Sequence, residues 1–519
     1  GTHRYTYGDF HERVRKLMGA LAGLGVGRGD RIATFGFNSY RHLELYFGVP
    51  CSGAVLHTLN IRLFAEQLTY VVNHARDKLI FVDRALVPHL EKLADTFESV
   101  KGYVVMGGVP KDTSLSPAYD YEEILEAAQD TDPVAVGERE AAALCYSSGT
   151  TGAPKGVLYD HRSLFLHSFG SCLVDSLGVS EADTILVVVP QFHANAWGLP
   201  FTAVMTGAKQ VYPGPFMGPE HLADLIESER VTLAAGVPTL WIGLYHYLNE
   251  HPKDTSSLTR MLVGGSAMPR SLIEAYERDF GIPVVHAWGM TETAPLGSVA
   301  KLKSNAMSLE EDEQYRLRSL QGMAPPGLEM RIAGDDGAEL PWDGKAVGEV
   351  QVRGPWVAGS YYESPDQASR FTDDGWFKTG DVAKMDPSGF MQITDRTKDL
   401  IKSGGEWISS VELENAAMAH DTVRECAVIA VPDEKWGERP MAVVVAVEGA
   451  EEFTLSELHD HLRERVAGWW LPDHLVFVTE LPKTSVGKFD KKVLRAMVAD
   501  GTLAPSSSGD DGGEAMRAS

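Results

Sequence analysis

The sequence predicts an α/β protein with a large N-terminal domain and a smaller α+β C-terminal domain. Up to about Gly322, short apolar runs rich in β-branched residues alternate with helical stretches, which is typical of parallel sheets covered by helices. After Gly322, short strands joined by Asp-Gly turns indicate a small antiparallel barrel or sheet. The length of 519 residues also exceeds what one hydrophobic core usually organises.

The predicted elements begin with a helix over residues 7–24, in which apolar side chains recur at helical spacing. The GLGVGRGD stretch at its end is expected to be a turn, because a dinucleotide-binding loop would follow a strand and open a helix. The next predicted strands are RIATFGF, VLHTLN and LIFVD, with a helix over residues 64–74 before the third. Later strands are TILVVVP, KQVYPG, VTLAAGVP, RMLVGG and PVVHAWG.

The C-terminal domain is predicted to begin near Asp395. It contains two strands (ECAVIAV and MAVVVAV), a helix over residues 455–466, a strand (HLVFV) and a final helix. The last stretch, PSSSGDDGGEAMRAS, has too few apolar residues to offset the entropy of ordering. We therefore expect domains over residues 1–394 and 395–504, and a disordered tail over residues 505–519.

Composition argues against several classes of partner. The net charge of −25, from 72 acidic and 47 basic residues, repels polyanions and disfavours nucleic acid and anionic membrane surfaces. No apolar run reaches about eighteen residues, so no integral membrane association is expected. The four cysteines are scattered without a short-spaced pair, which favours a reduced, cytoplasmic protein.

The strongest local signal is YSSGTTGAPKG over residues 146–156. Glycines let backbone N–H groups approach a phosphate closely, hydroxyls add donors, and Lys155 adds a positive charge. The spacing is not that of a Walker A loop. The segment predicts a polyphosphate-binding loop, although Ser/Thr/Gly stretches also occur as ordinary flexible loops.

The motif HAWGMTET begins at His286, directly after the apolar run IPVV. Its polar residues should emerge at the carboxyl end of a strand, where open α/β sheets bind ligands. Thr291 can donate to a phosphate oxygen, and Glu292 is a hard carboxylate suited to Mg²⁺ beside nucleotide phosphates. A Thr-Glu pair is as often the start of a helix.

Three charged segments lie further along the chain. WFKTGD ends at Asp381, whose carboxylate can accept both hydroxyls of a ribose, and DRTKDLIKSGGEWI from Asp395 has cations that can meet phosphates when domains close. PKTSVGKF places Lys488 after a glycine in a lysine-rich region, which suggests an anion site. A solvated charged surface is the alternative for each segment.

In this order, the motifs resemble those of the ANL adenylating superfamily, which includes acyl-CoA synthetases, peptide-synthetase adenylation domains and luciferases. The resemblance runs from about Tyr5 to Arg495. It implies an N-terminal adenylating domain of two sheet-helix subdomains plus a small barrel, and a mobile C-terminal domain hinged at Asp395. It also implies an AMP-forming acid:CoA ligase that uses ATP with Mg²⁺ and takes CoA as co-substrate. A homodimer is one possible quaternary state.

The resemblance assigns roles position by position. ATP or AMP binding is implied for Ser147, Ser148, Gly149, Thr150, Thr151, Gly152, Lys155, Gly265, Ser266, Ala267, His286, Ala287, Trp288, Gly289, Met290, Thr291, Asp381, Arg396, Lys398, Lys402 and Lys488. Catalysis is assigned to Lys488, Thr291, Glu292 and His193, the metal to Ser147 and Glu292, and CoA to Gly404, Gly405 and Trp407.

The implied chemistry explains these roles. A carboxylate is a poor electrophile, and adenylation converts its leaving group into AMP. Lys488 and Mg²⁺ would offset the repulsion between the carboxylate and the α-phosphate, and the thiol of CoA would then attack the mixed anhydride. A rotation about Asp395 that withdraws Lys488 would let one site run both half-reactions.

The nature of the acid is suggested by two apolar segments. PQFHANAWGL resembles the border of the acyl tunnel in fatty-acyl members, with His193 and Trp197 as candidates, although a large aromatic is also common in a core. AGVPTLWIGL adds an apolar wall with Val237 and Trp241. An apolar pocket favours a medium- or long-chain fatty acid over an amino acid, whose buried ammonium would need pairing.

Three alternatives remain open. HAWGMTET together with ELPWDGK from Glu339 also resembles methylmercaptopropionate-CoA ligases, which activate a short sulfur-containing acid. Some bacterial relatives activate nitrite to diazotise an arylamine, and a non-catalytic nucleotide-binding protein is the third alternative. Trp288, where tyrosine is more usual, and Asp490, soon after Lys488, depart from the family pattern.

Overall fold

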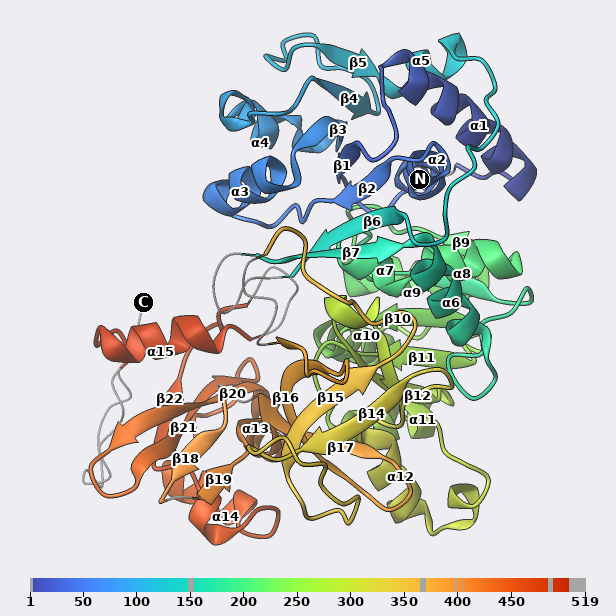
Figure 1. The fold of residues 1–519 in the computed structure, drawn as a ribbon. Coiled ribbons are helices and arrows are strands. Elements are labelled where there is room, and N and C mark those ends of the chain that lie inside the picture. Colours follow the sequence, from blue (N-terminus) through green and yellow to red (C-terminus); the bar gives the residue numbers. More distant parts are fainter. Residues whose placement is uncertain are drawn as a thin grey trace.

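The computed structural model describes residues 3–147, 154–364, 370–396, 399–404, 406–483 and 489–503. These residues form four sheets that follow one another along the chain (Figure 1). The first two sheets are mostly parallel, and their strands alternate with helices. The C-terminal sheet, drawn in orange, lies beside the third sheet, whose colour runs from yellow to orange (Figure 1). The predicted α/β class, with a smaller α+β unit at the C-terminus, is confirmed.

The first sheet has the strand order β5-β4-β3-β1-β2-β6-β7. Its strands are β1 (Arg31–Phe35), β2 (Val55–Thr58), β3 (Asp77–Asp83), β4 (Gly102–Met106), β5 (Ala118–Asp120), β6 (Ala141–Tyr146) and β7 (Gly156–Asp160). Its helices are α1 (Tyr7–Gly23), α2 (Tyr40–Cys51), α3 (Ala65–Ala75), α4 (Val87–Glu91) and α5 (Tyr121–Ala127). Strand β7 runs antiparallel to β6, so Ser147 and Lys155 lie at adjacent strand ends.

Helix α1 confirms the first predicted element. Thr6 caps it, since its side chain accepts from the backbone N–H of Asp9 while the Asp9 carboxylate accepts from the N–H of Thr6. The buried face carries Phe10, Val14, Leu17, Met18 and Leu21. Gly25 and Gly29 then adopt φ values of 74° and 77°, so the glycine-rich stretch is the predicted turn.

The second sheet has the order β13-β12-β11-β10-β8-β9 and is parallel except for β13. Its strands are β8 (Thr184–Val187), β9 (Lys209–Val211), β10 (Leu233–Gly236), β11 (Arg260–Val263), β12 (Val284–Gly289) and β13 (Leu296–Val299). Its helices are α6 (His161–Cys172), α7 (Ala194–Trp197), α8 (Leu199–Thr206), α9 (Pro219–Glu229), α10 (Pro238–Glu250), α11 (Arg270–Phe280) and α12 (Glu311–Ser319). As predicted, HAWGMTET occupies the carboxyl end of a strand.

The last two sheets are smaller. The third is a four-stranded antiparallel sheet of β14 (Glu329–Ala333), β15 (Gly348–Arg353), β16 (Phe377–Met385) and β17 (Met391–Arg396). The fourth contains β18 (Ile401–Ser403), β19 (Glu406–Ile408), β20 (Val423–Asp433), β21 (Gly437–Ala446) and β22 (His474–Phe477), with helices α13 (Ser410–Met418), α14 (Leu455–Leu462) and α15 (Lys491–Ala499). The strands and helices predicted for the C-terminal unit are therefore confirmed.

The expected boundary at Asp395 lies near the end of β17. The Asp395 carboxylate accepts a hydrogen bond of 2.7 Å from the backbone N–H of Ser410, which opens α13. The strand before the boundary and the helix after it are therefore directly joined. Within the described part of the chain, no helix combines the length and apolar character needed to cross a membrane.

Candidate active site

A cavity of about 1090 Å³ is lined by residues from all four sheets. The predicted site residues on its wall are Ser147, Lys155, His193, Trp197, Gly265, Ser266, Ala267, His286, Ala287, Trp288, Gly289, Met290, Thr291, Glu292 and Asp381. Segments as far apart in the sequence as Ser147 and Asp381 are thus brought together, and those from the parallel second sheet come from the carboxyl ends of its strands.

Ser147 and Lys155 meet at the entrance and exit of the glycine-rich segment. The backbone N–H of Ser147 donates to the carbonyl of Lys155 at 2.9 Å, and the N–H of Lys155 donates to the Ser147 hydroxyl at 3.3 Å. The Lys155 ammonium lies 5.1 Å from the centre of the Tyr361 ring. Ser148, Gly149, Thr150, Thr151 and Gly152 lie outside the described residues.

Thr291 and Glu292 sit in a short 3-10 turn (Thr291–Thr293) directly after β12 and are both buried. The Tyr361 hydroxyl donates to Glu292 Oε1 at 2.5 Å, and the Tyr159 hydroxyl donates to the Thr291 carbonyl at 2.6 Å. The pair therefore starts a turn and also lines the cavity. Two tyrosines fix its position, because each bonds a different part of the pair.

The end of β12 and the middle of β16 form another part of the cavity wall. The Trp288 indole N–H donates to Asp381 Oδ2 at 2.8 Å, and both side chains are buried. A Cβ at Gly297 would lie 2.4 Å from the Trp288 ring, so the large indole requires glycine there. His286 Nδ1 lies 3.0 Å from the Ser319 carbonyl, and burial lowers the pKa of His286, which keeps the ring neutral.

His193 and Trp197 lie at the apolar part of the wall. The four residues of α7, from Ala194 to Trp197, have φ values of 43°, 52°, 50° and 56°, which makes this segment a left-handed turn. Left-handed backbone costs about 1–2 kcal/mol per non-glycine residue, so the surroundings must hold the turn. Trp197 is half-buried, and a Cβ at Gly264 would lie 3.1 Å from its ring.

Trp241 and Val237 are not where the sequence suggested. Trp241 is fully buried in a hydrophobic cluster beneath the second sheet, and its indole N–H donates to the Leu262 carbonyl at 3.3 Å. Val237 is half-buried but does not line the cavity, whereas Pro238, Thr239 and Ile242 do. Trp241 lies on the flank of α10 that packs against β10 and β11, where its ring is close to Gly236 and its N–H meets the Leu262 carbonyl, whereas residues 238, 239 and 242 lie together on the neighbouring flank.

The C-terminal unit contributes Glu414, Asn415 and Met418 of α13, together with Phe489, Asp490 and Lys491. Lys402 and Gly404 belong to the exposed edge around β18 and do not line the cavity. The backbones of Arg396 and Trp407 lie in β17 and β19. Lys398, Gly405 and Lys488 lie outside the described residues.

Sequence reasoning missed Asn195, which supports the left-handed turn. Its side-chain oxygen accepts from the Cys145 thiol at 3.0 Å and from the Thr58 hydroxyl at 3.3 Å. Burial raises the pKa of Cys145 to about 11, so the thiol keeps its proton and can donate. Cys145 precedes Tyr146 in β6, so Asn195 joins the left-handed turn to the strand before the glycine-rich segment. No sequence motif marks Asn195 as a supporting residue, and Tyr361 was missed for the same reason.

The sequence matches the family model of the AMP-binding enzyme over residues 1–362 and that of the AMP-binding enzyme C-terminal domain over residues 412–488. The chain belongs to the AMP-binding enzyme family. The cavity described above contains residues from both matched regions, including Glu292 from the first and Glu414 from the second.

Three relatives within this family are similar over nearly their whole length. The long-chain-fatty-acid–CoA ligase of Thermus thermophilus is 49% identical, covering 95% of this chain and 90% of that protein. The 3-methylmercaptopropionyl-CoA ligase of Ruegeria lacuscaerulensis is 46% identical (95% and 91% covered), and the medium-chain-fatty-acid–CoA ligase of Ectopseudomonas oleovorans is 45% identical (96% and 91% covered). This family member is an acyl-CoA ligase.

Solved structures show the same fold. ATP-bound MatB from Rhodopseudomonas palustris superposes with a TM-score of 0.82 at 26% identity, covering 95% of this chain and 93% of that chain. Apo MatB superposes with a TM-score of 0.73, at the same identity and with 96% and 94% covered. The arrangement of this AMP-binding enzyme is therefore nearer to the ATP-bound form of MatB than to the apo form.

Proposed function

We propose that this ligase activates a medium- or long-chain fatty acid as an acyl-adenylate and then transfers the acyl group to CoA, releasing AMP and pyrophosphate. The observation that carries the proposal is that one cavity has a polar end around Glu292 and Asp381 and an apolar end around Leu177 and Leu262. A fatty acid has the same division, because its carboxylate must meet ATP while its chain leaves water.

The apolar end supports an uncharged chain as its occupant. Four of its residues, Leu177, Trp197, Leu262 and Leu296, belong to one hydrophobic cluster, and Pro238, Thr239 and Ile242 of α10 also line the cavity. None of these seven side chains carries a charge. An ammonium group would remain unpaired there at a cost of several kcal/mol, so an amino acid is disfavoured.

At the polar end, Ser147, Lys155 and the segment between them would hold the phosphates, with Thr291 at the α-phosphate. Asp381 would accept from the ribose hydroxyls, and Trp288, by donating to its other side, would orient the carboxylate. His286 to Met290 and Gly265 to Ala267 would surround the adenine. The acid carboxylate would be placed near His193, which lines the same cavity.

Glu292 fits a magnesium ion that is shared with the nucleotide phosphates. It is a buried carboxylate held by the Tyr361 hydroxyl, and Mg²⁺ bound with phosphates commonly takes one or two carboxylates. Among the described residues, no group of three or more His, Cys, Asp or Glu side chains gathers to hold an ion without the nucleotide. Such an ion would supply charge neutralisation at the phosphates.

The C-terminal unit would provide Lys488 for adenylation. Phe489, Asp490 and Lys491, which directly follow Lys488, line the cavity, and this supports the assignment. The greater similarity to ATP-bound MatB supports an arrangement ready for the first half-reaction. A rotation about Asp395 would then replace Lys488 with the segment of Gly404, Gly405 and Trp407 for the attack by CoA.

A short sulfur-containing acid is the second candidate, because the identity to the 3-methylmercaptopropionyl-CoA ligase of Ruegeria lacuscaerulensis, 46%, lies between those to the long-chain (49%) and medium-chain (45%) fatty-acid ligases. A cytoplasmic location remains part of the proposal, and the unpaired state of all four cysteines supports it. A homodimer remains a prediction.

The decisive experiment is ATP–pyrophosphate exchange with butyrate, octanoate, dodecanoate, palmitate, 3-methylmercaptopropionate and nitrite. We expect exchange to be strongest with one of the three longer fatty acids and to be followed by acyl-CoA formation when CoA is added. Strongest exchange with 3-methylmercaptopropionate would select the second candidate. Exchange with nitrite alone would refute both.

A further inference from the structure

The loop between α6 and β8, residues 173–183, borders the apolar end of the cavity through Leu177. Leu177 from this loop lines the cavity and is 8% exposed. It also belongs to one hydrophobic cluster with Leu262, Leu296 and Trp197, which line the same end. The position of Leu177 therefore limits the space available to an acyl chain.

Strand β11 shows how deep this end lies. Gly264 and Leu262 both line the cavity, and Arg260 opens the strand. Because a strand rises about 3.3 Å per residue and alternate residues share a face, each step from residue 264 to 262 to 260 is about 7 Å. The cavity thus runs from the carboxyl end of β11 toward its amino end, where Leu177 meets Arg260.

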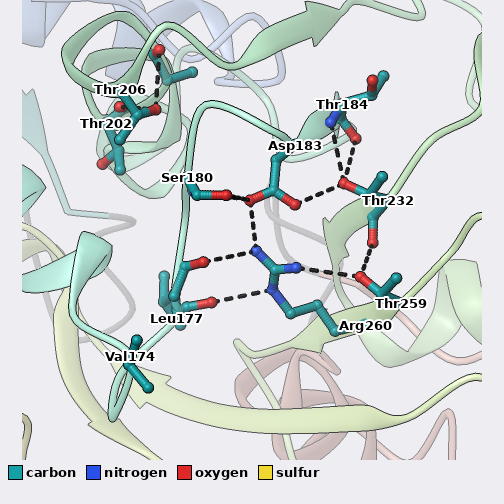
Figure 2. A network of polar contacts seen from close by, with 12 residues as sticks. Val174, Leu177, Ser180, Asp183, Thr184, Thr202, Thr206, Thr232, Thr259 and Arg260 are labelled. Atoms are coloured by element: carbon teal, nitrogen blue, oxygen red, sulfur yellow. Dashed lines mark hydrogen bonds and ion pairs between the residues drawn. The ribbon is translucent and has the colours of Figure 1, made fainter.

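Arg260 holds the loop by its backbone (Figure 2). Its Nε donates to the Leu177 carbonyl at 3.1 Å, and its Nη2 donates to the Gly178 carbonyl at 3.1 Å. The same Nη2 lies 2.9 Å from Asp183 Oδ2, at the other end of the loop. One guanidinium therefore fixes three points of the loop that carries Leu177.

Asp183 is held in turn by three further donors. Its Oδ2 accepts from the backbone N–H and the hydroxyl of Ser180, and its Oδ1 accepts from the Thr232 hydroxyl at 2.7 Å (Figure 2). Burial favours a raised pKa, but the hydrogen bonds from Arg260, Thr232 and Ser180 outweigh it and lower the pKa of Asp183. The carboxylate stays ionised, so the ion pair persists at neutral pH.

We propose that the Asp183–Arg260 pair determines the longest acid that the ligase accepts, because it holds Leu177 at the closed end of the cavity. This inference rests on the proposed fatty-acid function. Leu177 is the residue that limits chain length, and Arg260 is a positioning residue that acts through it. Neither residue touches the nucleotide end.

The first test changes the wall itself. Leu177→Ala should raise the ratio of kcat/KM for palmitate to that for octanoate by about tenfold, and Leu177→Phe should lower it by a similar factor. The KM for ATP should not change in either variant. Val179→Ala is the matched control, because Val179 is a buried residue of the same loop that does not line the cavity.

The second test changes the support. Arg260→Gln should shift the ratio in the same direction as Leu177→Ala, because the loop loses its ionic anchor. Arg260→Lys should give a smaller shift, because an ammonium can pair with Asp183 but cannot present a planar fork to two carbonyls. If Arg260→Gln fails to fold, the Leu177 variants and Arg260→Lys still decide the question.

The outcomes separate this inference from the proposed function. If the wild-type ligase activates fatty acids and neither Leu177 variant changes the ratio, the inference is refuted and the function stands. An unchanged ratio in Arg260→Gln with a shifted ratio in Leu177→Ala would refute the role of the ion pair. If the wild type activates no fatty acid, both fall together.

Discussion

The cavity has two walls that are anchored differently. The wall built from residues before Asp395 carries Glu292 in the turn after β12 and Asp381 within β16, and each buried carboxylate is bonded by an aromatic side chain. The wall after Asp395 comes mainly from α13 and the start of α15, and hydrogen bonds from Ser409 and Ser410 join α13 to the end of β17.

This difference suggests that the two walls have different roles in the reaction. Carboxylates held by buried hydrogen bonds within one sheet and the turn beside it can keep the nucleotide in the same place throughout the reaction. A wall joined to the rest at one strand end can be exchanged between two half-reactions, because few contacts must break for it to rotate. If so, substitutions in the two walls should have separate effects on the reaction.

The largest expected effect is on the C-terminal wall. Lys488→Ala should slow acyl-adenylate formation by about two to three orders of magnitude, because a preorganised positive charge is lost from the transition state. Conversion of a supplied acyl-adenylate and CoA should remain near normal, since the lysine is remote in that step. Lys435→Ala, at an exposed position of the same unit, is the control. Equal loss in both half-reactions would contradict the exchange of walls.

A second prediction is that lowering the pH destabilises the N-terminal part of the chain and stabilises the unit after Asp395. Burial lowers the pKa of His42 and of His167 to about 4, so these residues stabilise the N-terminal part above their ordinary value of 6.5. That contribution, roughly 3 kcal/mol each, is lost as pH falls from 6.5 through 4. Burial raises the pKa of Glu414 to about 7 against the opposing effect of Lys491, so its contribution is present below 4.5 and lost as pH rises through 7.

Hydrogen exchange measured by mass spectrometry between about pH 5 and about pH 8, corrected for intrinsic rates, would check this. Peptides around α2 and α6 should lose protection toward acid, whereas peptides around α13 should gain it. Glu414→Gln should abolish the change around α13 and leave the other peptides unaffected. If protection changes with pH in the same direction in the peptides around α2, α6 and α13, this prediction is refuted.

A smaller effect is expected when a support on the N-terminal wall is removed. Tyr361→Phe deletes the hydroxyl that bonds Glu292, so half-maximal adenylation should need about ten- to hundredfold more Mg²⁺. Tyr245→Phe is the matched control, because it removes a tyrosine–carboxylate bond of 2.6 Å to Asp279 at the surface. An unchanged magnesium requirement would remove Glu292 from the metal site.

The smallest effect should be confined to the acid. Trp197→Ala should change the preference between octanoate and palmitate by about tenfold without changing the KM for ATP. Trp241→Phe should reduce thermal stability and leave the preference unchanged, because that indole lies in the core. An unaltered preference in Trp197→Ala would mean that this residue also serves packing alone.

Most elements of the fold could be predicted because their signals are local. Helix α1 follows from spacing and a capping residue, and β12 from an apolar run that ends in HAWGMTET. The left-handed turn at Ala194 could not be predicted, since its residues have no preference for that backbone and it depends on Asn195 binding strand β6. Trp241 was misplaced because an apolar stretch does not reveal which helix face meets the cavity.

By itself, the sequence indicated the adenylating chemistry of this protein, because several short motifs of glycines, hydroxyls, a lysine and carboxylates follow one another in the order found in a known superfamily. The tertiary structure decided which residues line and support the apolar end of the cavity. Arg260 meets Leu177 across 83 residues, and Asn195 meets Cys145 across 50, so neither contact is visible in any local pattern. The physical reason is that recognition of phosphate needs particular groups at fixed spacing, whereas an apolar pocket needs shape, which distant segments create when they pack together.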